Sequence, residues 1–231
     1  MAQHVLQGNP PITVSLRRSA RARRLSLRVS RLDGRVTLTL PPRAPEREAI
    51  AFLRDREGWL RGHLAGIGTE NRPGIGNHLP FLGVEVPIIA GAVRRLTLRD
   101  GALIVPDEPA ARTASRLQTF LKAQARDHLA QASDHYAAQL GLSYKSLTLR
   151  DTRSRWGSCS SSGALMYSWR LVMAPPAVLH YVAAHEVAHL AEMNHSAAFW
   201  AVVARLYPGH AECRGWLRSH GETLHRVRFT D

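Results

Sequence analysis

Residues 185–195, HEVAHLAEMNH, hold three histidines and two glutamates within an otherwise apolar segment. A buried polar group without a partner costs about 1–3 kcal/mol, so this cluster is either a local defect or a site. His185, Glu186 and His189 form an H-E-x-x-H pattern. On a helix, residues four apart lie one above the other, roughly 6 Å along the axis. That spacing lets His185 and His189 bind one Zn²⁺.

Glu186 follows the first histidine, where its carboxylate can take a proton from a water on the same metal. A catalytic zinc usually has three protein ligands and one open position. His195 is the best third candidate, provided that the chain turns after the helix. We expect Asn194 to make this turn in the left-handed conformation and Ser196 to cap the next helix. Weaker third-ligand candidates are Glu192 and His210.

The first half of the chain has the alternation typical of paired strands. Apolar residues alternate with polar ones over 25–29 and 36–40, on either side of Asp33-Gly34, which predicts a hairpin. A helical pattern follows over 45–64. A strand over 81–89 and a second hairpin, 94–98 with 102–105 across Asp100-Gly101, complete a β-rich region that we expect to end near residue 108.

The second half, 109–231, reads as mixed helix and strand. A long helix over 110–140 is predicted to stop at Gly141. Strands are expected over 146–150 and 164–172, the latter a candidate edge for an extended peptide. Helices are expected over 176–193, 196–207 and 208–225. The fold class is therefore α+β, with a shared core between the two halves as an open alternative.

Composition places the chain among soluble proteins. It has 231 residues, 45% of them hydrophobic, and two cysteines, which fits a reducing cytoplasm. The first residues lack the apolar run of a signal peptide, and no apolar run is long enough to span a bilayer. We expect a cytoplasmic protein without membrane contact. No sequence motif indicates an oligomeric state.

The formal net charge is +13, from 31 basic and 18 acidic residues. Such a surplus is typical of a surface for nucleic acid or an acidic partner, or of a solvated basic surface. Arg24 and Arg28 would lie on one side of the first hairpin, because alternate strand residues share a face. They belong to an arginine-rich run comprising Arg17, Arg18, Arg21, Arg23, Arg24, Arg28, Arg31 and Arg35.

The motifs RWGSC, SWRL, HEVAHL and MNHSAAFW, all within residues 153–200, resemble the YgjP-like metallopeptidases, relatives of the SprT-like and minigluzincin zinc proteases. A looser resemblance extends to SARARRLSLRV and the first hairpin. It implies a zincin-like half with a small sheet and an active-site helix. Ser168 stands where the family usually has asparagine, and His180 where it often has aspartate, which puts substrate contacts there in doubt.

Carried over by position, the resemblance implies one Zn²⁺ per chain, with His185, His189 and His195 as ligands and Glu186 as general base. It predicts a zinc-dependent metallopeptidase that hydrolyses peptides or proteins with a metal-bound water. Alternatives are a metal-dependent hydrolase of a non-peptide substrate such as a nucleotide, or a DNA-associated protease. Candidates for stabilising the oxyanion or contacting substrate are Arg155, Tyr181 and Tyr207.

Overall fold

The computed structural model describes residues 2–30, 34–65 and 71–229. The chain divides into two compact units, Met1–Glu70 and Asn71–Asp231. Each unit has its own hydrophobic core. The architecture is α+β, as predicted, with sheets in the N-terminal half and helices dominating the C-terminal half.

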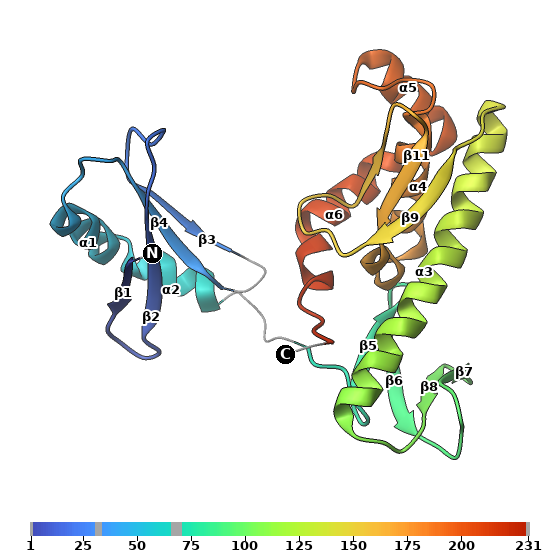
Figure 1. Ribbon diagram of the computed structural model, residues 1–231, viewed down its shortest axis with the longest axis horizontal. Coiled ribbons are helices and arrows are strands. Elements are labelled where there is room, and N and C mark those ends of the chain that lie inside the picture. Colours follow the sequence, from blue (N-terminus) through green and yellow to red (C-terminus); the bar gives the residue numbers. More distant parts are fainter. Residues whose placement is uncertain (1, 31–33, 66–70, 230–231) are drawn as a thin grey trace. The chain divides into compact units, whose positions relative to one another are not determined.

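Unit 1 is a four-stranded sheet, order β1-β2-β4-β3, covered on one face by two helices (Figure 1). The predicted first hairpin is present as the antiparallel pair β3–β4, although its Asp33 lies outside the described residues. Strands β1 and β2 were not predicted, and the helix expected over 45–64 breaks at Arg56. The elements are β1 (Ala2–Leu6), β2 (Ile12–Arg18), β3 (Ser26–Val29), β4 (Val36–Leu40), α1 (Glu46–Asp55) and α2 (Glu57–Ala65).

Unit 2 begins with a second four-stranded sheet, order β5-β6-β8-β7. Asp100 and Gly101 both have positive φ, 50° and 74°. This is the backbone of a type I′ turn, the geometry that the Asp-Gly pair favours in a two-residue hairpin. The strands are β5 (His78–Phe81), β6 (Val84–Ala90), β7 (Thr97–Arg99) and β8 (Ala102–Val105).

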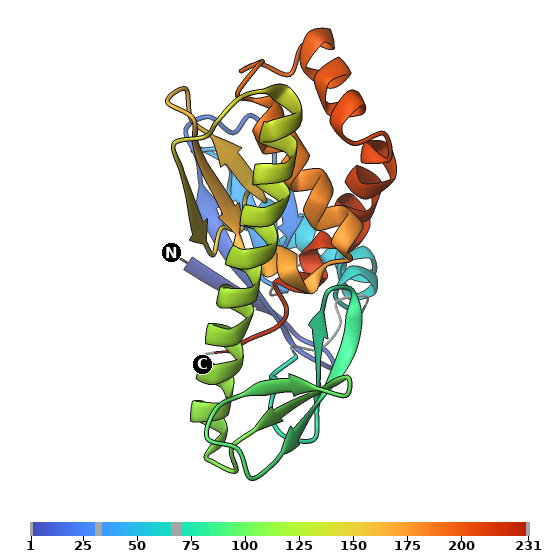
Figure 2. The ribbon, with the colours of Figure 1, turned by 90° about the vertical axis from the view of Figure 1, so that its right-hand side faces the viewer.

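Helix α3 (Ala110–Leu140) runs from this sheet to the second sheet of unit 2 (Figure 2). Its buried stripe includes Leu129, Ala132 and Tyr136, at the three- and four-residue spacing of an amphipathic helix. The helix ends as expected at Gly141, whose φ of 67° is left-handed. A single long helix thus supplies one wall for both sheets of unit 2.

The second sheet of unit 2 has the order β10-β11-β9, with β10–β11 antiparallel and β11–β9 parallel. The strand predicted over 164–172 ends at Ser168 and continues as the 3₁₀ helix η1 (Trp169–Met173). Its proposed role as an open edge is wrong, because β11 is the central strand and β10 lies at the edge. The strands are β9 (Ser146–Arg150), β10 (Gly157–Cys159) and β11 (Ala164–Ser168).

Three helices complete unit 2: α4 (Pro176–Ala188), α5 (Ala197–Leu206) and α6 (His210–Leu224). The compact units divide at Glu70, whereas the sequence placed the end of the β-rich region near residue 108. Strands β5–β8 belong to unit 2 because their apolar faces join the core built on α3. The functional division into 1–108 and 109–231 stays a prediction. Within the described residues, no helix is both long and apolar enough to cross a membrane.

The first and last described segments of unit 2 are paired. Asn71 forms a parallel bridge with Val227. Its backbone N–H donates to the Arg226 carbonyl at 3.1 Å, and its own carbonyl accepts from the Arg228 N–H at 2.8 Å. The two ends of unit 2 therefore lie side by side.

Arg170, in η1, ties the C-terminal segment to the core. Its side chain is 8% exposed and binds both carboxylate oxygens of Asp151, at 2.6 and 3.1 Å. Its Nη1 donates to the carbonyls of Leu224 and Val227, at 2.8 and 2.9 Å. One guanidinium therefore joins η1, the end of α6 and the residue that follows β9.

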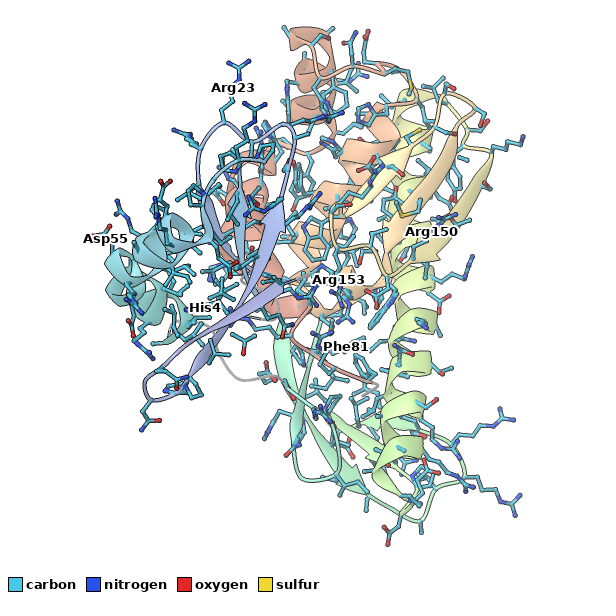
Figure 3. The ribbon with its side chains drawn as sticks, turned by 60° about the vertical axis from the view of Figure 1, so that its left-hand side comes forward. His4, Arg23, Asp55, Phe81, Arg150 and Arg153 are labelled. Atoms are coloured by element: carbon cyan, nitrogen blue, oxygen red, sulfur yellow. The ribbon has the colours of Figure 1, made fainter. Side chains whose placement is uncertain are left out.

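Replacing Arg170 by methionine is expected to destabilise unit 2 by about 3 kcal/mol, because the buried carbonyls of Leu224 and Val227 lose their donor. Arg150→Met is the matched control. Arg150 is exposed (Figure 3), and substitutions at such sites usually change stability by less than about 0.5 kcal/mol. Denaturant unfolding followed by tryptophan fluorescence measures both. Equal midpoints for the two variants would contradict this assignment.

The Asp151–Arg170 pair also predicts an acid response. Burial opposes ionisation of Asp151, but the hydrogen bonds and charge of Arg170 outweigh it and lower the pKa below its ordinary value of 3.8. A depressed pKa stabilises the fold above pH 3.8, and this contribution is lost as pH falls through the folded-state pKa. The unfolding midpoint of the native protein should thus fall more steeply below pH 4 than that of Asp151→Asn. Parallel pH profiles would refute the linkage.

Candidate metal centre and active site

Helix α4 carries the H-E-x-x-H residues through the core. Pro176 occupies its first turn, where a missing N–H costs nothing. Val182, Ala183, Ala184, Val187 and Ala188 are all at most 3% exposed, so the helix is apolar nearly all round. Its burial holds the side chains of this helix in one orientation.

The helix ends at Ala188, with His189 at its C-cap, rather than continuing to residue 193 as predicted. The chain then turns and enters α5, where Ser196 Oγ accepts from the Phe199 N–H at 3.3 Å, as the predicted N-cap should. The expectation of a left-handed Asn194 is wrong, since the described non-glycine residues with positive φ are Leu82 and Asp100. The turn is made instead by hydrogen bonds between residues three apart: the Leu190 N–H donates to the Val187 carbonyl, and the Ala191 N–H donates to the Ala188 carbonyl.

This turn brings the three histidines together. One ring nitrogen from each of His185, His189 and His195 lies within 4.8 Å of the others. His185 Nε2 and His195 Nε2 are 3.1 Å apart. Tetrahedral zinc with bonds of about 2.0–2.1 Å separates two nitrogen ligands by about 3.3 Å. The cluster therefore fits one such ion with only small ring movements.

Phe199, the first buried residue of α5, packs among all three imidazoles. Its ring stacks on His189 at 4.4 Å and 26° between planes. It meets His185 and His195 edge-on, at 4.9 and 4.8 Å. The side chain is fully buried, so it acts as a rigid spacer that sets how closely the rings approach. The sequence interpretation missed this residue, although it lies four positions after His195.

The surroundings favour neutral imidazoles with free lone pairs. Burial lowers the pKa of His185 to about 4 and also lowers the pKa of His189, and the neighbouring histidines add to both effects. His189 Nδ1 lies 3.0 Å from the Glu192 carbonyl oxygen. Because a carbonyl can only accept, Nδ1 carries the proton of this bond and Nε2 is left as the ligand atom.

Glu186 is 5% exposed, and burial raises its pKa to about 8, against a smaller opposing effect of Arg155. Gly157, at the start of β10, makes room for it. A Cβ at Gly157 would lie 2.6 Å from both Glu186 Cγ and Oε1. The sheet edge and the carboxylate can approach this closely only because residue 157 has no side chain.

Two adjoining cavities meet at Glu186. The first, of about 450 Å³, is lined by the three histidines, Glu186, Met193 and the segment that includes β10. The second, of about 220 Å³, continues past Gly157 and is largely apolar. His185, Glu186, Arg155 and Gly157 line both. The second cavity is completed by Trp156, Tyr181, Val182 and Leu217.

Of the other predicted site residues, some line the two cavities and others lie away from them. Arg155 lines both cavities and Tyr181 lines the second, where it meets His185 edge-on at 5.9 Å. Tyr207 lies elsewhere: it packs edge-on against Tyr136, and burial, with neighbouring Cys213, raises the pKa of its hydroxyl. Glu192 and His210, the weaker ligand candidates, are not in the histidine cluster.

The two positions that depart from the family pattern lie outside both cavities. Ser168 is fully buried at the end of β11, and its N–H donates to the Trp156 carbonyl at 2.8 Å. His180 Nδ1 faces the Tyr136 hydroxyl at 3.2 Å, on the α3 side of α4. Neither substitution alters the lining of the cavities.

A family model described as "YgjP-like, metallopeptidase domain" matches residues 23–220 of the chain. The chain belongs to the YgjP-like metallopeptidase family. The match begins in unit 1 and includes the whole histidine cluster. This YgjP-like protein therefore carries a metallopeptidase domain, and the resemblance inferred from its motifs is confirmed.

The YgjP-like chain is also similar to a solved structure, the metallopeptidase zymogen abylysin of Pyrococcus abyssi. The two are 21% identical, over 39% of this chain and 92% of that one, with a TM-score of 0.37. A similarity this low has no bearing on the site. No curated protein matches the chain.

If His195 completes a three-nitrogen site, His195→Ala should weaken zinc binding by at least about 100-fold. His210→Ala is the matched control, since His210 stacks on Trp200 outside the cluster and its loss should leave binding unchanged. Elemental analysis and titration against a coloured chelator measure both variants. Zinc retained by His195→Ala but lost by His210→Ala would move the third ligand to His210.

Proposed function

We propose that this protein is a zinc-dependent metallopeptidase in which His185, His189 and His195 hold the metal and Glu186 is the general base. The observation that carries the proposal is the single cavity shared by three imidazole nitrogens and a buried carboxylate. A closed structural zinc would need a fourth protein ligand, and the described residues add no further histidine, cysteine or carboxylate to the cluster.

The donor set favours zinc over harder cations. Imidazole nitrogen suits zinc, whereas magnesium and calcium prefer oxygen ligands. When bound, zinc polarises a carbonyl oxygen and acidifies water. The Nδ1–H of His189, held by the Glu192 carbonyl, fixes the tautomer that this role requires.

Glu186 moves the proton in the proposed reaction. Its carboxylate takes a proton from the attacking water in the cavity and passes it to the departing amine nitrogen. Burial raises the pKa of the Glu186 carboxyl to about 8, so the group can hold a proton near neutral pH. Positive charge brought into the cavity lowers this pKa and favours the carboxylate that accepts the proton. The same group therefore serves both transfers.

A peptide is the substrate class that the surroundings favour. Edge strand β10 lines the first cavity and offers backbone groups for strand addition. The apolar second cavity, with Leu217 and Trp156 in its wall, suits an aliphatic or aromatic side chain next to the bond being cut. Arg155, at the rim of both cavities, would stabilise negative charge that develops on the carbonyl oxygen.

Gly157→Ala should lower kcat by about 100-fold, because displacing a catalytic group by about 1 Å has that effect and a Cβ there would meet the Glu186 side chain. Glu186→Gln should abolish cleavage, and both variants should keep their zinc. The control is Gly215→Ala, since a Cβ at Gly215 meets nothing within 4 Å.

The assay is cleavage of a mixed peptide library, with nucleotides as competing substrates and zinc content measured in parallel. Full activity in Glu186→Gln would reject the general base. Hydrolysis of nucleotides but not peptides would reject the peptidase assignment while keeping the metal site.

A further inference from the structure

The sheet of unit 1 has one apolar and one polar face. Val14, Leu16, Val36 and Leu38 point into the core beneath α1 and α2. The opposite face is set by the strand register. Arg17, Thr39 and Ser26 form one row across β2, β4 and β3, and Ser15, Thr37 and Arg28 form the next row. We call these six residues the arginine–hydroxyl face.

Arginines continue from this face into the connection between β2 and β3. Arg17, Arg21, Arg23, Arg24 and Arg28 are all exposed, and Arg23 projects outward from its loop (Figure 3). None of them makes a hydrogen bond or ion pair to a residue in the described ranges. Their donors are therefore available to a ligand.

Two other arginines of unit 1 differ, because their donors are used within the fold. Arg18 Nη1 binds the carbonyls of Pro42 and Ala44, both at 2.9 Å. Arg61 binds the carbonyls of Pro10 and Gln7, at 2.7 and 3.0 Å. Arg18 and Arg61 therefore stabilise the fold of unit 1, whereas the exposed arginines make no such contacts within the described residues.

The described acidic residues of unit 1 lie on its helices, and one of them, Glu46, lines a cavity together with Arg17. The first acidic residue of the chain is Asp33, so β1, β2 and β3 contain none, and β4 adds none. The acidic side chains in the described part of unit 1 are Glu46, Glu48, Asp55 and Glu57, all on α1 and α2. The four strands therefore carry basic residues and no acidic residue.

We propose that the arginine–hydroxyl face, together with Arg21, Arg23 and Arg24, binds double-stranded nucleic acid through its phosphates. Arginine and the hydroxyls of serine and threonine are donors to phosphate oxygens. The face carries no aromatic side chain, whereas single-strand binders stack bases on aromatic residues. It also lacks the aromatic and apolar centre of a protein interface, apart from Val5 at its edge. Binding is sequence-independent.

The test is fluorescence anisotropy of the full chain with a 20-base-pair DNA duplex between 50 and 200 mM salt. Five phosphate contacts give a slope of log K against log salt of about −4 to −5. The double variant Arg17→Glu with Arg28→Glu should bind at least tenfold more weakly. Arg17→Gln with Arg28→Gln, a milder change, should show a smaller loss in the same direction.

The matched control is Arg47→Glu with Arg54→Glu, which makes the same charge change at exposed positions of α1. It should bind the duplex within about twofold of the native protein. Equal losses of duplex affinity in the control and in the sheet variants would show that binding depends only on net charge, and would overturn the proposal. So would no binding at 50 mM salt.

Two competitors decide the class of partner. Tighter binding of the corresponding single strand would overturn the duplex assignment. Polyglutamate that displaces the duplex at equal charge concentration would assign the face to an acidic protein instead. Removing the metal with a chelator should leave duplex binding unchanged, because none of these residues lies in the histidine cluster.

Discussion

The site depends on where helix α4 stops. His185 and His189 need a helix for their spacing, but His195 reaches them only because the helix ends after Ala188. A helix continued unbroken through residue 195 would carry that residue roughly 15 Å along the axis from residue 185. Phe199 then fixes the approach of the three rings from the start of α5. The histidine cluster is thus a property of a helix end held by an aromatic spacer.

Burial acts on the pKa values in this cavity in opposite directions, lowering those of His185 and His189 and raising that of Glu186. It favours the neutral form of His185 and His189, which leaves nitrogen lone pairs for a cation. It also favours the protonated form of Glu186, which leaves a carboxyl that can return a proton. A single apolar environment therefore keeps the proposed ligands and the proposed base uncharged, and a cation bound at the histidines would favour the carboxylate that the base needs.

The sequence predicted what depends on short-range pattern. The H-E-x-x-H spacing, the Ser196 cap, the end of α3 at Gly141 and the Asp100-Gly101 turn all follow from local periodicity or backbone preference. Features set by long-range packing escaped it. Strand β10 is only three residues long, and the role of Gly157 follows from its approach to a residue 29 positions away. Tyr207 was a plausible substrate contact by type, yet its surroundings, Tyr136 and Cys213, are set by tertiary structure.

The pairing of Asn71 with Val227 has a topological consequence. The segments that begin and end unit 2 are joined by one β-bridge. The two ends of the unit therefore lie next to each other, and the same fold could be built from a chain that starts at another point. Such proteins tolerate circular permutation and the exchange of appended modules. Unit 2 is in this sense a structural cassette, to which an N-terminal segment can be joined without interrupting a strand or helix of its core.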